Sequence, residues 1–203
     1  MLINTNNIKE IDFSKSELIP AIVQDKNTGI ILMQGFMNYE AMEKTLDCNM
    51  VTFYSRSKQR LWTKGESSDN YLIVKEVHTD CDFDSILILA EPKGPTCHLG
   101  TQSCFGNAKP ELAFVAQLNQ IISQRKNDDP KESYTASLFA KDISRSAQKV
   151  GEEGVEVALA AVKQDIDELK NESADLLYHL LVLLQRSETD ISQVVKVLEQ
   201  RHK

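Results

Sequence analysis

The segment Gly106-Asn107-Ala108-Lys109-Pro110 separates two halves of the chain that have different patterns of apolar residues. Before it, short apolar runs rich in β-branched and aromatic residues alternate with turn-forming residues, a pattern typical of strands. After it, the strand signals stop and apolar residues recur at helical spacing. The sequence therefore predicts two domains of different fold class, at residues 1–106 and 111–203.

The first half begins with a predicted β-hairpin. Its apolar runs at residues 19–24 and 30–35 flank a turn-forming segment at 25–29. Asn38 is the expected N-cap of a short helix that ends near residue 47. Further strands are expected at residues 51–54, 71–77 and 85–90. This half is therefore predicted to be an α+β domain with a mainly antiparallel sheet.

The second half carries the spacing of amphipathic helices. Leu112, Val115, Leu118 and Ile122 lie on one helical face, and Asp128-Asp129-Pro130 then breaks the chain. The residues that follow are mostly helix formers with apolar stripes. They predict a long helix over 135–163, a second over 166–186 and a shorter one over 191–201. The C-terminal domain is therefore expected to be an all-α helical bundle.

The 203 residues carry a formal net charge of −7 at pH 7 and are 41% hydrophobic, enough for ordinary globular cores. Neither half is basic, which argues against a protein that binds nucleic acid by neutralising phosphates. No apolar stretch is long enough to span a membrane, and the N-terminal residues show no secretory signal. We therefore expect a cytoplasmic protein whose cysteines are reduced and free to bind metal.

The segment Asp80-Cys81-Asp82-Phe83-Asp84 combines the ligands that two different metals prefer. Carboxylates suit magnesium, whereas thiolates suit zinc. If these residues are extended, the aspartates share one face of a strand and Cys81 points to the other. Cys81 could then complete a zinc site with Cys97 and Cys104, either across the strand or across a subunit boundary. Such a site would leave a fourth position for water, as catalytic zinc requires.

Simpler interpretations of these residues stay open. Three aspartates in five residues are common in solvated turns, and scattered cysteines are often small buried apolar residues. Turn-forming residues near Cys97 and Cys104 favour the metal site, because they could bring the two thiols together in a loop. His98 is either a surface histidine or a proton carrier for a hydrolytic water.

A second acidic cluster is predicted in the helical half, from Glu152, Glu153, Glu156, Glu172 and Asp175. The first three lie close together on one helix, and the last two lie at i and i+3 of the next. Antiparallel packing would gather these carboxylates, and buried like charges so close together would require magnesium or manganese. The alternative is the solvated face of two amphipathic helices.

Cationic residues precede this acidic cluster. Arg145, Ser146 and Lys149 lie one or two helical turns upstream of the acids. They could hold phosphates that a bound metal also bridges. This neighbourhood favours a site for a phosphorylated substrate over a solvated surface.

Two sets of motifs resemble known enzyme families. Residues 51–105 include Leu61-Trp62-Thr63-Lys64-Gly65-Glu66-Ser67-Ser68 and Gly94-Pro95-Thr96-Cys97-His98, and they resemble phosphoribosyl-AMP cyclohydrolase. Residues 133–184 include Lys149-Val150-Gly151-Glu152-Glu153-Gly154-Val155-Glu156. They resemble phosphoribosyl-ATP pyrophosphatase, of the all-α nucleotide pyrophosphohydrolase group. Their order matches the fused bifunctional family of bacterial histidine biosynthesis.

The first resemblance implies roles for residues of the N-terminal domain. Arg56, Lys64 and Ser67 would contact the substrate phosphates, and His98 is the candidate catalytic residue. Asp69 stands where relatives usually have glycine, which adds a negative charge near the phosphates. The metal ligands would be Asp80, Asp82 and Asp84 for Mg2+ and Cys81, Cys97 and Cys104 for Zn2+, with Cys81 contributed by the partner subunit of a homodimer.

The second resemblance implies that the five acidic residues of the helical half bind Mg2+. The C-terminal domain would hydrolyse phosphoribosyl-ATP to phosphoribosyl-AMP and pyrophosphate. The N-terminal domain would then open the adenine ring to give the formimino carboxamide ribonucleotide. Two other classes stay open: a house-cleaning nucleotide pyrophosphohydrolase with an extra zinc module, and a non-catalytic scaffold stabilised by metal.

Overall fold

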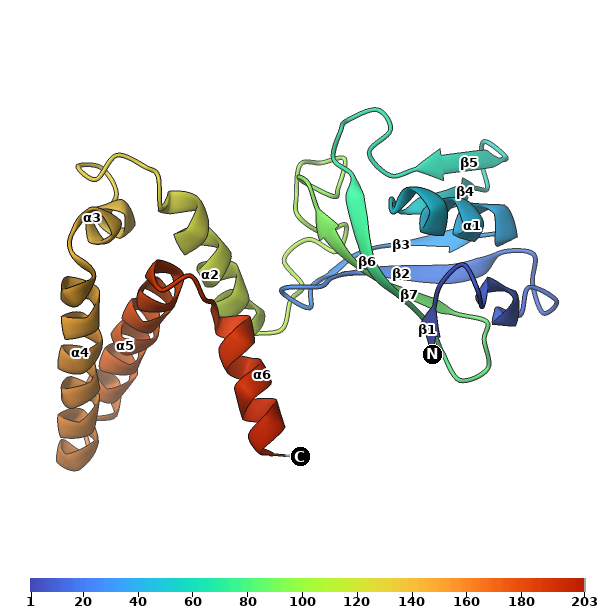
Figure 1. The fold of residues 1–203 in the computed structure, drawn as a ribbon. Helices are drawn as coiled ribbons and strands as arrows, with labels where there is room; N and C mark the ends of the chain where they lie inside the picture. Colours follow the sequence, from blue (N-terminus) through green and yellow to red (C-terminus); the bar gives the residue numbers. More distant parts are fainter. Residues whose placement is uncertain (203) are drawn as a thin grey trace. The chain divides into compact units, whose positions relative to one another are not determined.

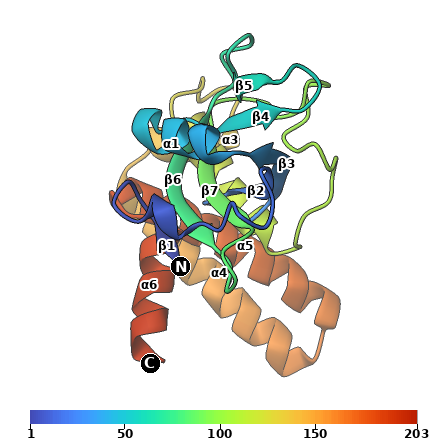
Figure 2. The ribbon, with the colours of Figure 1, turned by 90° about the vertical axis from the view of Figure 1, so that its right-hand side faces the viewer.

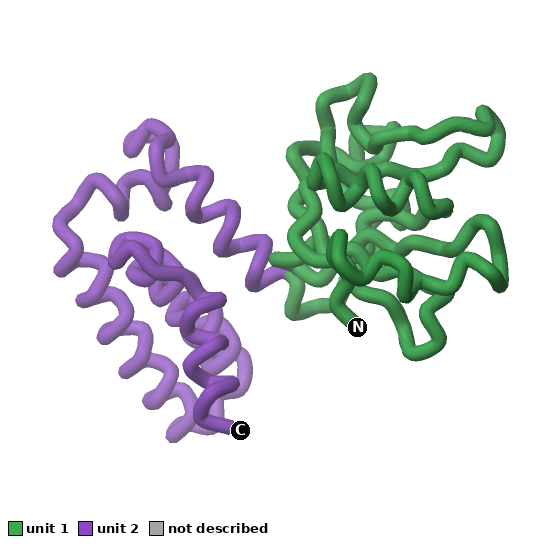
Figure 3. Tube along the Cα trace, turned by 45° about the vertical axis from the view of Figure 1, so that its right-hand side comes forward, with its two compact units in different colours: residues 1–113 green, residues 114–203 purple. Residues whose placement is uncertain are grey.

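The computed structural model describes residues 1–202, which fall into two compact units divided between Ala113 and Phe114 (Figure 3). The N-terminal unit is built on a sheet, and the C-terminal unit is built from helices (Figure 1). Among the described residues, no helix is both long and apolar enough to cross a membrane.

The N-terminal unit contains a sheet in the order β1-β6-β7-β2-β3. Its strands are β1 (Leu2–Ile3), β2 (Ile19–Asp25), β3 (Ile31–Met37), β6 (Leu72–Thr79) and β7 (Ile86–Pro92). All neighbouring strands in this sheet pair antiparallel except β2 and β7, which are parallel. The predicted α+β domain with a mainly antiparallel sheet is confirmed, and the β2–β7 pairing makes the sheet mixed.

One side of this sheet carries α1 (Tyr39–Cys48) and the hairpin of β4 (Thr52–Ser55) and β5 (Arg60–Thr63) (Figure 1, Figure 2). A short 3-10 helix, η1 (Ile8–Glu10), follows β1. The Asn38 side chain accepts a hydrogen bond from the Ala41 amide at 2.9 Å, so the predicted N-cap of α1 is confirmed.

The core of the N-terminal unit follows the two-residue period of its strands. In β2, Ile19, Ala21 and Val23 are buried, because alternate side chains of a strand point to the same face. Gly35 of β3 lies against the ring of Phe53, and a Cβ there would overlap that ring. Phe53 in turn stacks on Trp62 with 5.8 Å between ring centroids. The core therefore supports one side of the loop that follows β5.

The C-terminal unit consists of α2 (Ala113–Arg125), α3 (Tyr134–Ala140), α4 (Ile143–Lys163), α5 (Ile166–Arg186) and α6 (Ile191–Arg201). Helices α4 and α5 pack along each other as an antiparallel pair, joined by a tight connection in which Gln164 has a φ of 59° (Figure 1). Buried Ile122, Leu138, Leu181 and Val182 form the core. The predicted helical domain is confirmed, including the bounds of the last two helices.

The predicted continuous helix over 135–163 is wrong, because the chain breaks at Lys141 and Asp142. Lys141 is extended, with φ −83° and ψ 170°, and the Asp142 side chain caps α4 by accepting from the Ser144 amide at 2.9 Å. Arg186 of α5 donates to the carbonyls of Leu138 and Lys141. These bonds satisfy carbonyls at the end of α3 that a continuous helix would have satisfied internally.

Candidate active sites

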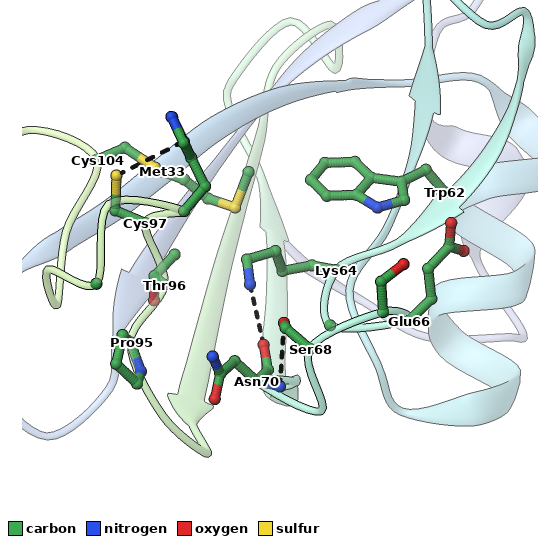
Figure 4. A pocket seen from close by; sticks show the side chains of 14 residues that line it. Met33, Trp62, Lys64, Glu66, Ser68, Asn70, Pro95, Thr96, Cys97 and Cys104 are labelled. Carbon is green, nitrogen blue, oxygen red and sulfur yellow. Dashed lines mark hydrogen bonds between the residues drawn. The ribbon is translucent and has the colours of Figure 1, made fainter.

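The N-terminal unit contains a pocket of about 420 Å³ between two loops (Figure 4). Strand β5 contributes Trp62, and the loop after it contributes Lys64, Gly65, Glu66, Ser67, Ser68 and Asn70. The other loop follows β7 and contributes Pro95, Thr96, Cys97, His98, Gly100 and Cys104. The second loop is tied to β3, because the Cys104 amide donates to the Leu32 carbonyl at 2.8 Å. The structure thus brings together two segments that the motifs had singled out.

Lys64 lies in this pocket and is only 8% exposed. Burial lowers the pKa of its ammonium group, and the nearby thiols of Cys104 and Cys97 oppose that shift. Its Nζ donates to the Asn70 carbonyl at 3.0 Å (Figure 4). This is the one hydrogen bond of the ammonium among the described residues, so two of its donors stay available for an anionic group of a substrate.

Two other predicted phosphate contacts have different positions. Ser67 lines the pocket beside Lys64. Arg56 is exposed and is not among the described residues that line the pocket, and its guanidinium lies 4.0 Å from the centroid of the Phe36 ring. The structure therefore groups Ser67, but not Arg56, with Lys64.

Cys97 and Cys104 both line the pocket (Figure 4). Hydrogen bonds from the Leu99 amide and the Thr101 side chain lower the pKa of the Cys97 thiol, whereas burial raises the pKa of Cys104. His98 also lines the pocket, with its Nδ1 3.9 Å from the Cys97 sulfur. Two thiols and an imidazole are thus gathered beside the buried ammonium of Lys64.

Cys81 lies in the turn between β6 and β7, where it is exposed. Its sulfur is 4.0 Å from Oδ1 of Asp82. Among the described residues, no cluster of three potential metal ligands joins Cys81 to Cys97 and Cys104. Within the part of the chain that the structure describes, Cys81 therefore lies apart from the other two thiols.

Residues 80–84 form a turn, so the extended conformation on which the expected strand faces depended does not occur. Phe83 has a φ of 64°, and Oδ1 of Asp80 accepts from the amides of Asp84 and Ser85 at 3.2 Å. These local bonds compete with strand pairing, as aspartate side chains often do. The turn still places one carboxylate oxygen each of Asp80, Asp82 and Asp84 within 4.8 Å of one another.

Lys15 pairs with this aspartate cluster, a contact that the sequence did not predict. Its Nζ lies 3.2 Å from Oδ2 of Asp82 and 3.0 Å from Oδ2 of Asp84. Hydrogen bonds with the two carboxylates raise the pKa of Lys15. No local pattern indicated the pair, because Lys15 is 67 residues away from Asp82.

The helical unit gathers Glu153 and Glu156 of α4 with Glu172 of α5, with carboxylate oxygens within 4.8 Å of one another. A hydrogen bond to Glu153, some loss of solvation and the charge of Glu172 raise the pKa of the exposed Glu156. Glu152 and Asp175, which were predicted for the same cluster, lie outside this group of three. Such crowding of carboxylates is unfavourable without a compensating cation.

Lys149 and Arg145, the cations predicted to contact phosphates, form ion pairs with acidic residues of α4. Lys149 Nζ lies 2.8 Å from Oε1 of Glu153 and 3.1 Å from Oε2 of Glu152. Hydrogen bonds to Glu153 and Glu152 raise the pKa of Lys149 and keep it charged. Arg145 lies farther away, 3.6 Å from Oε1 of Glu152. Two cations therefore flank the acidic cluster on α4.

His179 of α5 belongs to the same region, although the sequence reading missed it. It is 4% exposed, its Nε2 lies 3.8 Å from Oε1 of Glu153, and its Nδ1 lacks a hydrogen-bond partner among the described residues. Burial lowers the pKa of the imidazole, and the charge of Glu153 opposes this. The signal was available, because His179 follows Glu172 by seven residues and so shares its helical face.

Comparison with known families accounts for both units. Residues 33–106 match the family model of phosphoribosyl-AMP cyclohydrolase, and residues 115–202 match that of phosphoribosyl-ATP pyrophosphohydrolase. The chain is therefore a two-domain hydrolase, with a thiol-containing pocket in its first domain and a carboxylate cluster in its second.

Similar proteins combine the same two domains. The histidine biosynthesis bifunctional protein HisIE of Escherichia coli strain K12 is 54% identical over 195 residues, which cover 96% of each chain. The protein of the same name from Yersinia pestis is 52% identical, and the match covers 99% of each chain. The one from Photobacterium profundum is 51% identical, and the match covers 99% of this chain and 98% of its own. The chain belongs to this family of bifunctional histidine biosynthesis proteins, and the predicted bifunctional hydrolase is confirmed.

Proposed function

We propose that the two domains perform the two reactions of the family at the side-chain clusters described above. The C-terminal domain hydrolyses phosphoribosyl-ATP to phosphoribosyl-AMP and pyrophosphate beside Glu153, Glu156 and Glu172. The N-terminal domain then opens the adenine ring of phosphoribosyl-AMP in the pocket of Lys64 and Cys97. The observation that carries this proposal is the convergence of titratable groups at one place in each domain.

The carboxylate cluster of the helical domain fits Mg2+. Its three carboxylates offer oxygen ligands close together, and a divalent cation would offset the repulsion among them. When bound, Mg2+ would neutralise charge on the substrate phosphates. Lys149 and Arg145 would contact the phosphates, and a carboxylate of the cluster would orient and deprotonate the attacking water. Glu152, next to Glu153 on α4, and Asp175, three residues after Glu172 on α5, would complete the ligand set.

The thiols of the pocket fit Zn2+ when a third ligand is added. Cys97 and Cys104 are gathered in one subunit, and Cys81 of a partner subunit would complete the set. Zinc would supply Lewis acidity for the attack of water on C6 of the purine. Lys64 and Ser67 would hold the substrate phosphates, and His98 would carry a proton between the water and the ring.

The aspartate turn fits Mg2+ by the same chemistry. One oxygen each of Asp80, Asp82 and Asp84 lies within 4.8 Å of the others, and two of the carboxylates are paired with Lys15. The ion pairs with Lys15 support this proposal, because they place a positive charge beside the carboxylates. Mg2+ bound there would compete with Lys15 for the same oxygens.

Two observations support a homodimer: Cys81 lies apart from Cys97 and Cys104, and several apolar side chains are exposed. Leu99, beside the cysteine pocket, is 78% exposed. On α4, Val155, Leu159 and Val162 follow helical spacing and are 60%, 51% and 83% exposed. Such a stripe is more typical of a helix that packs against a partner than of a solvated helix. The free thiols fit a reducing cytoplasm.

Metal removal and return test the assignment of metals. Protein treated with a chelator should lose both activities, and the two should return with different ions. Mg2+ alone should restore pyrophosphate release from phosphoribosyl-ATP, whereas ring opening of supplied phosphoribosyl-AMP should need Zn2+ as well. Ring opening at full rate with Mg2+ alone would contradict the zinc assignment.

A second experiment tests the shared site. Cys81→Ser should lower zinc content, measured by atomic absorption, and zinc binding by the wild type should strengthen with protein concentration, because a shared ligand couples metal binding to dimerisation. Val162→Glu should weaken the dimer, as measured by light scattering, because it places a charge in the apolar stripe. Full zinc content in Cys81→Ser would show that Cys81 is not a ligand.

A further inference from the structure

We propose that Tyr134 is the base-stacking residue of the pyrophosphohydrolase domain. The adenine ring of phosphoribosyl-ATP would lie on the exposed ring of Tyr134, while its polyphosphate reaches Glu153, Glu156 and Glu172. This inference rests on the proposed function, because it takes that acidic cluster as the place where the phosphate chain reacts.

Tyr134 is supported by a second aromatic ring and is still largely exposed. Its ring stacks on Tyr178 with 6.2 Å between centroids and an angle of 22° between the planes. The Tyr178 hydroxyl is hydrogen-bonded to the Thr135 hydroxyl at 2.8 Å, which fixes the supporting ring. Tyr134 is nevertheless 57% exposed. An exposed aromatic face on a fixed support is suited to stacking a planar base.

The two tyrosines line a pocket of about 580 Å³ whose charge favours the nucleoside part of a nucleotide. Three carboxylates, from Asp128, Asp129 and Glu132, line it together with a single cation, Arg125. An acidic lining repels a polyphosphate chain, but it can accept hydrogen bonds from ribose hydroxyls and from the exocyclic nitrogen of adenine. The pocket is also large enough for a small ligand.

His179 places this pocket directly beside the acidic cluster. Its ring meets the Tyr134 ring edge-on, with 6.2 Å between centroids, and meets Tyr178 at 5.3 Å. Its Nε2 lies 3.8 Å from Oε1 of Glu153. One side chain therefore separates the aromatic face from the carboxylates, so a single nucleotide could contact both with its base and its phosphates.

Steady-state kinetics with three substitutions tests this assignment. Tyr134→Phe keeps the ring and should leave the KM for phosphoribosyl-ATP within about twofold. Tyr134→Leu keeps apolar bulk but removes the aromatic face, and it should raise KM about 5- to 150-fold, the range of base stacking on an aromatic side chain. Tyr134→Trp offers a larger face and should give a KM no higher than the wild type. Tyr39→Leu, an exposed tyrosine of the other domain, should leave this KM unchanged.

A probe without a base separates stacking from general damage. Inorganic pyrophosphate with Mg2+, used as a product inhibitor, should have the same inhibition constant in Tyr134→Leu as in the wild type. An unchanged KM in Tyr134→Leu, a KM raised by Tyr134→Trp, or an equal loss of pyrophosphate binding would each overturn the proposal. If Tyr134→Leu does not fold, the comparison of Tyr134→Trp with Tyr134→Phe still decides it. Glu156→Gln tests the acidic cluster separately, since full pyrophosphate release in that variant would refute the proposed function itself.

Discussion

Asp69 lies between Ser68 and Asn70, two residues that line the cyclohydrolase pocket, but it is not itself among the lining residues. Its φ of 58° is in the left-handed region, which glycine adopts freely and aspartate tolerates better than most residues. Its amide donates to the Gly65 carbonyl at 2.9 Å, within the tight turn of the loop. The backbone therefore explains why glycine or aspartate suits this position, without a role for the charge in substrate binding.

We expect Asp69→Gly to leave the KM for phosphoribosyl-AMP unchanged across a salt series. Asp69→Ala should lower the free energy of unfolding by about 1 kcal/mol relative to Asp69→Gly, because alanine is strained at this φ. Urea denaturation measures the second effect. A KM that falls in Asp69→Gly, most strongly at low salt, would show instead that the charge of Asp69 faces the substrate phosphates.

Lys64→Ala should raise the dissociation constant of a non-hydrolysable phosphoribosyl-AMP analogue about 10- to 150-fold, because a charge-assisted hydrogen bond contributes about 1.5–3 kcal/mol. Trp62 lines the same pocket and stacks on Phe53, so its emission can report the binding. Lys58→Ala, at an exposed lysine of the β4–β5 turn, is the matched control and should not change the affinity. Equal affinity in the Lys64 and Lys58 variants would remove Lys64 from the substrate site.

Single residues also show what the sequence could and could not reveal about the sites. Helical spacing predicted that Glu153, Glu156 and Glu172 would come together, because their helices are regular and adjacent. The aspartates of residues 80–84 gather through a turn, not through strand alternation, so that grouping was expected for the wrong reason. The positions of Arg56 and Lys15 depend on contacts between distant segments, which no local pattern encodes.

At the scale of elements, helix ends were predictable where local capping decides them. Asp165 and Asp190 cap α5 and α6 with bonds to amides only two or three residues ahead, and the predicted bounds agree. The break between α3 and α4 depends also on Arg186, 45 residues from Lys141. The parallel pairing of β2 with β7 is similarly non-local. Contacts of this kind override local propensity, and the sequence did not reveal them.

Asp190 allows a test of one such cap and of its pH dependence. Its Oδ1 accepts hydrogen bonds from the Ser192 hydroxyl and from the amides of Ser192 and Gln193, and these bonds lower the pKa of Asp190 below its ordinary value of 3.8. A lowered pKa in the folded state means that this stabilisation is complete above pH 3.8 and is lost as the pH falls through the folded-state pKa.

Asp190→Ala should therefore lower the free energy of unfolding by about 1 kcal/mol at neutral pH, and Asp190→Asn by less, because an amide oxygen can also cap a helix. The difference between the wild type and Asp190→Asn should shrink as the pH falls below 4, since only the carboxylate titrates. Urea unfolding followed by far-ultraviolet circular dichroism measures both. A difference that stays constant with pH would mean that the charge of Asp190 does not contribute.

At the scale of the whole molecule, the two chemistries are separate in both sequence and structure. The thiol pocket draws its residues from 33–104, and the acidic cluster draws its residues from 153–172. Each cluster lies within one compact unit that has its own hydrophobic core. The change of pattern near residue 106 was visible in the sequence because strands and helices bury apolar residues with different periods.

We therefore expect the two activities to be separable by mutation. Glu156→Gln should lower pyrophosphate release from phosphoribosyl-ATP at least about 100-fold and leave ring opening of supplied phosphoribosyl-AMP at the wild-type rate, because removing one ligand weakens a metal site without touching the other domain. Cys97→Ala should do the reverse. Circular dichroism confirms that each variant is folded.

Mixed in equal amounts, the two variants should convert phosphoribosyl-ATP to the ring-opened product, since phosphoribosyl-AMP released by one can enter the other. Loss of both activities in either folded variant would mean that the two sites depend on each other.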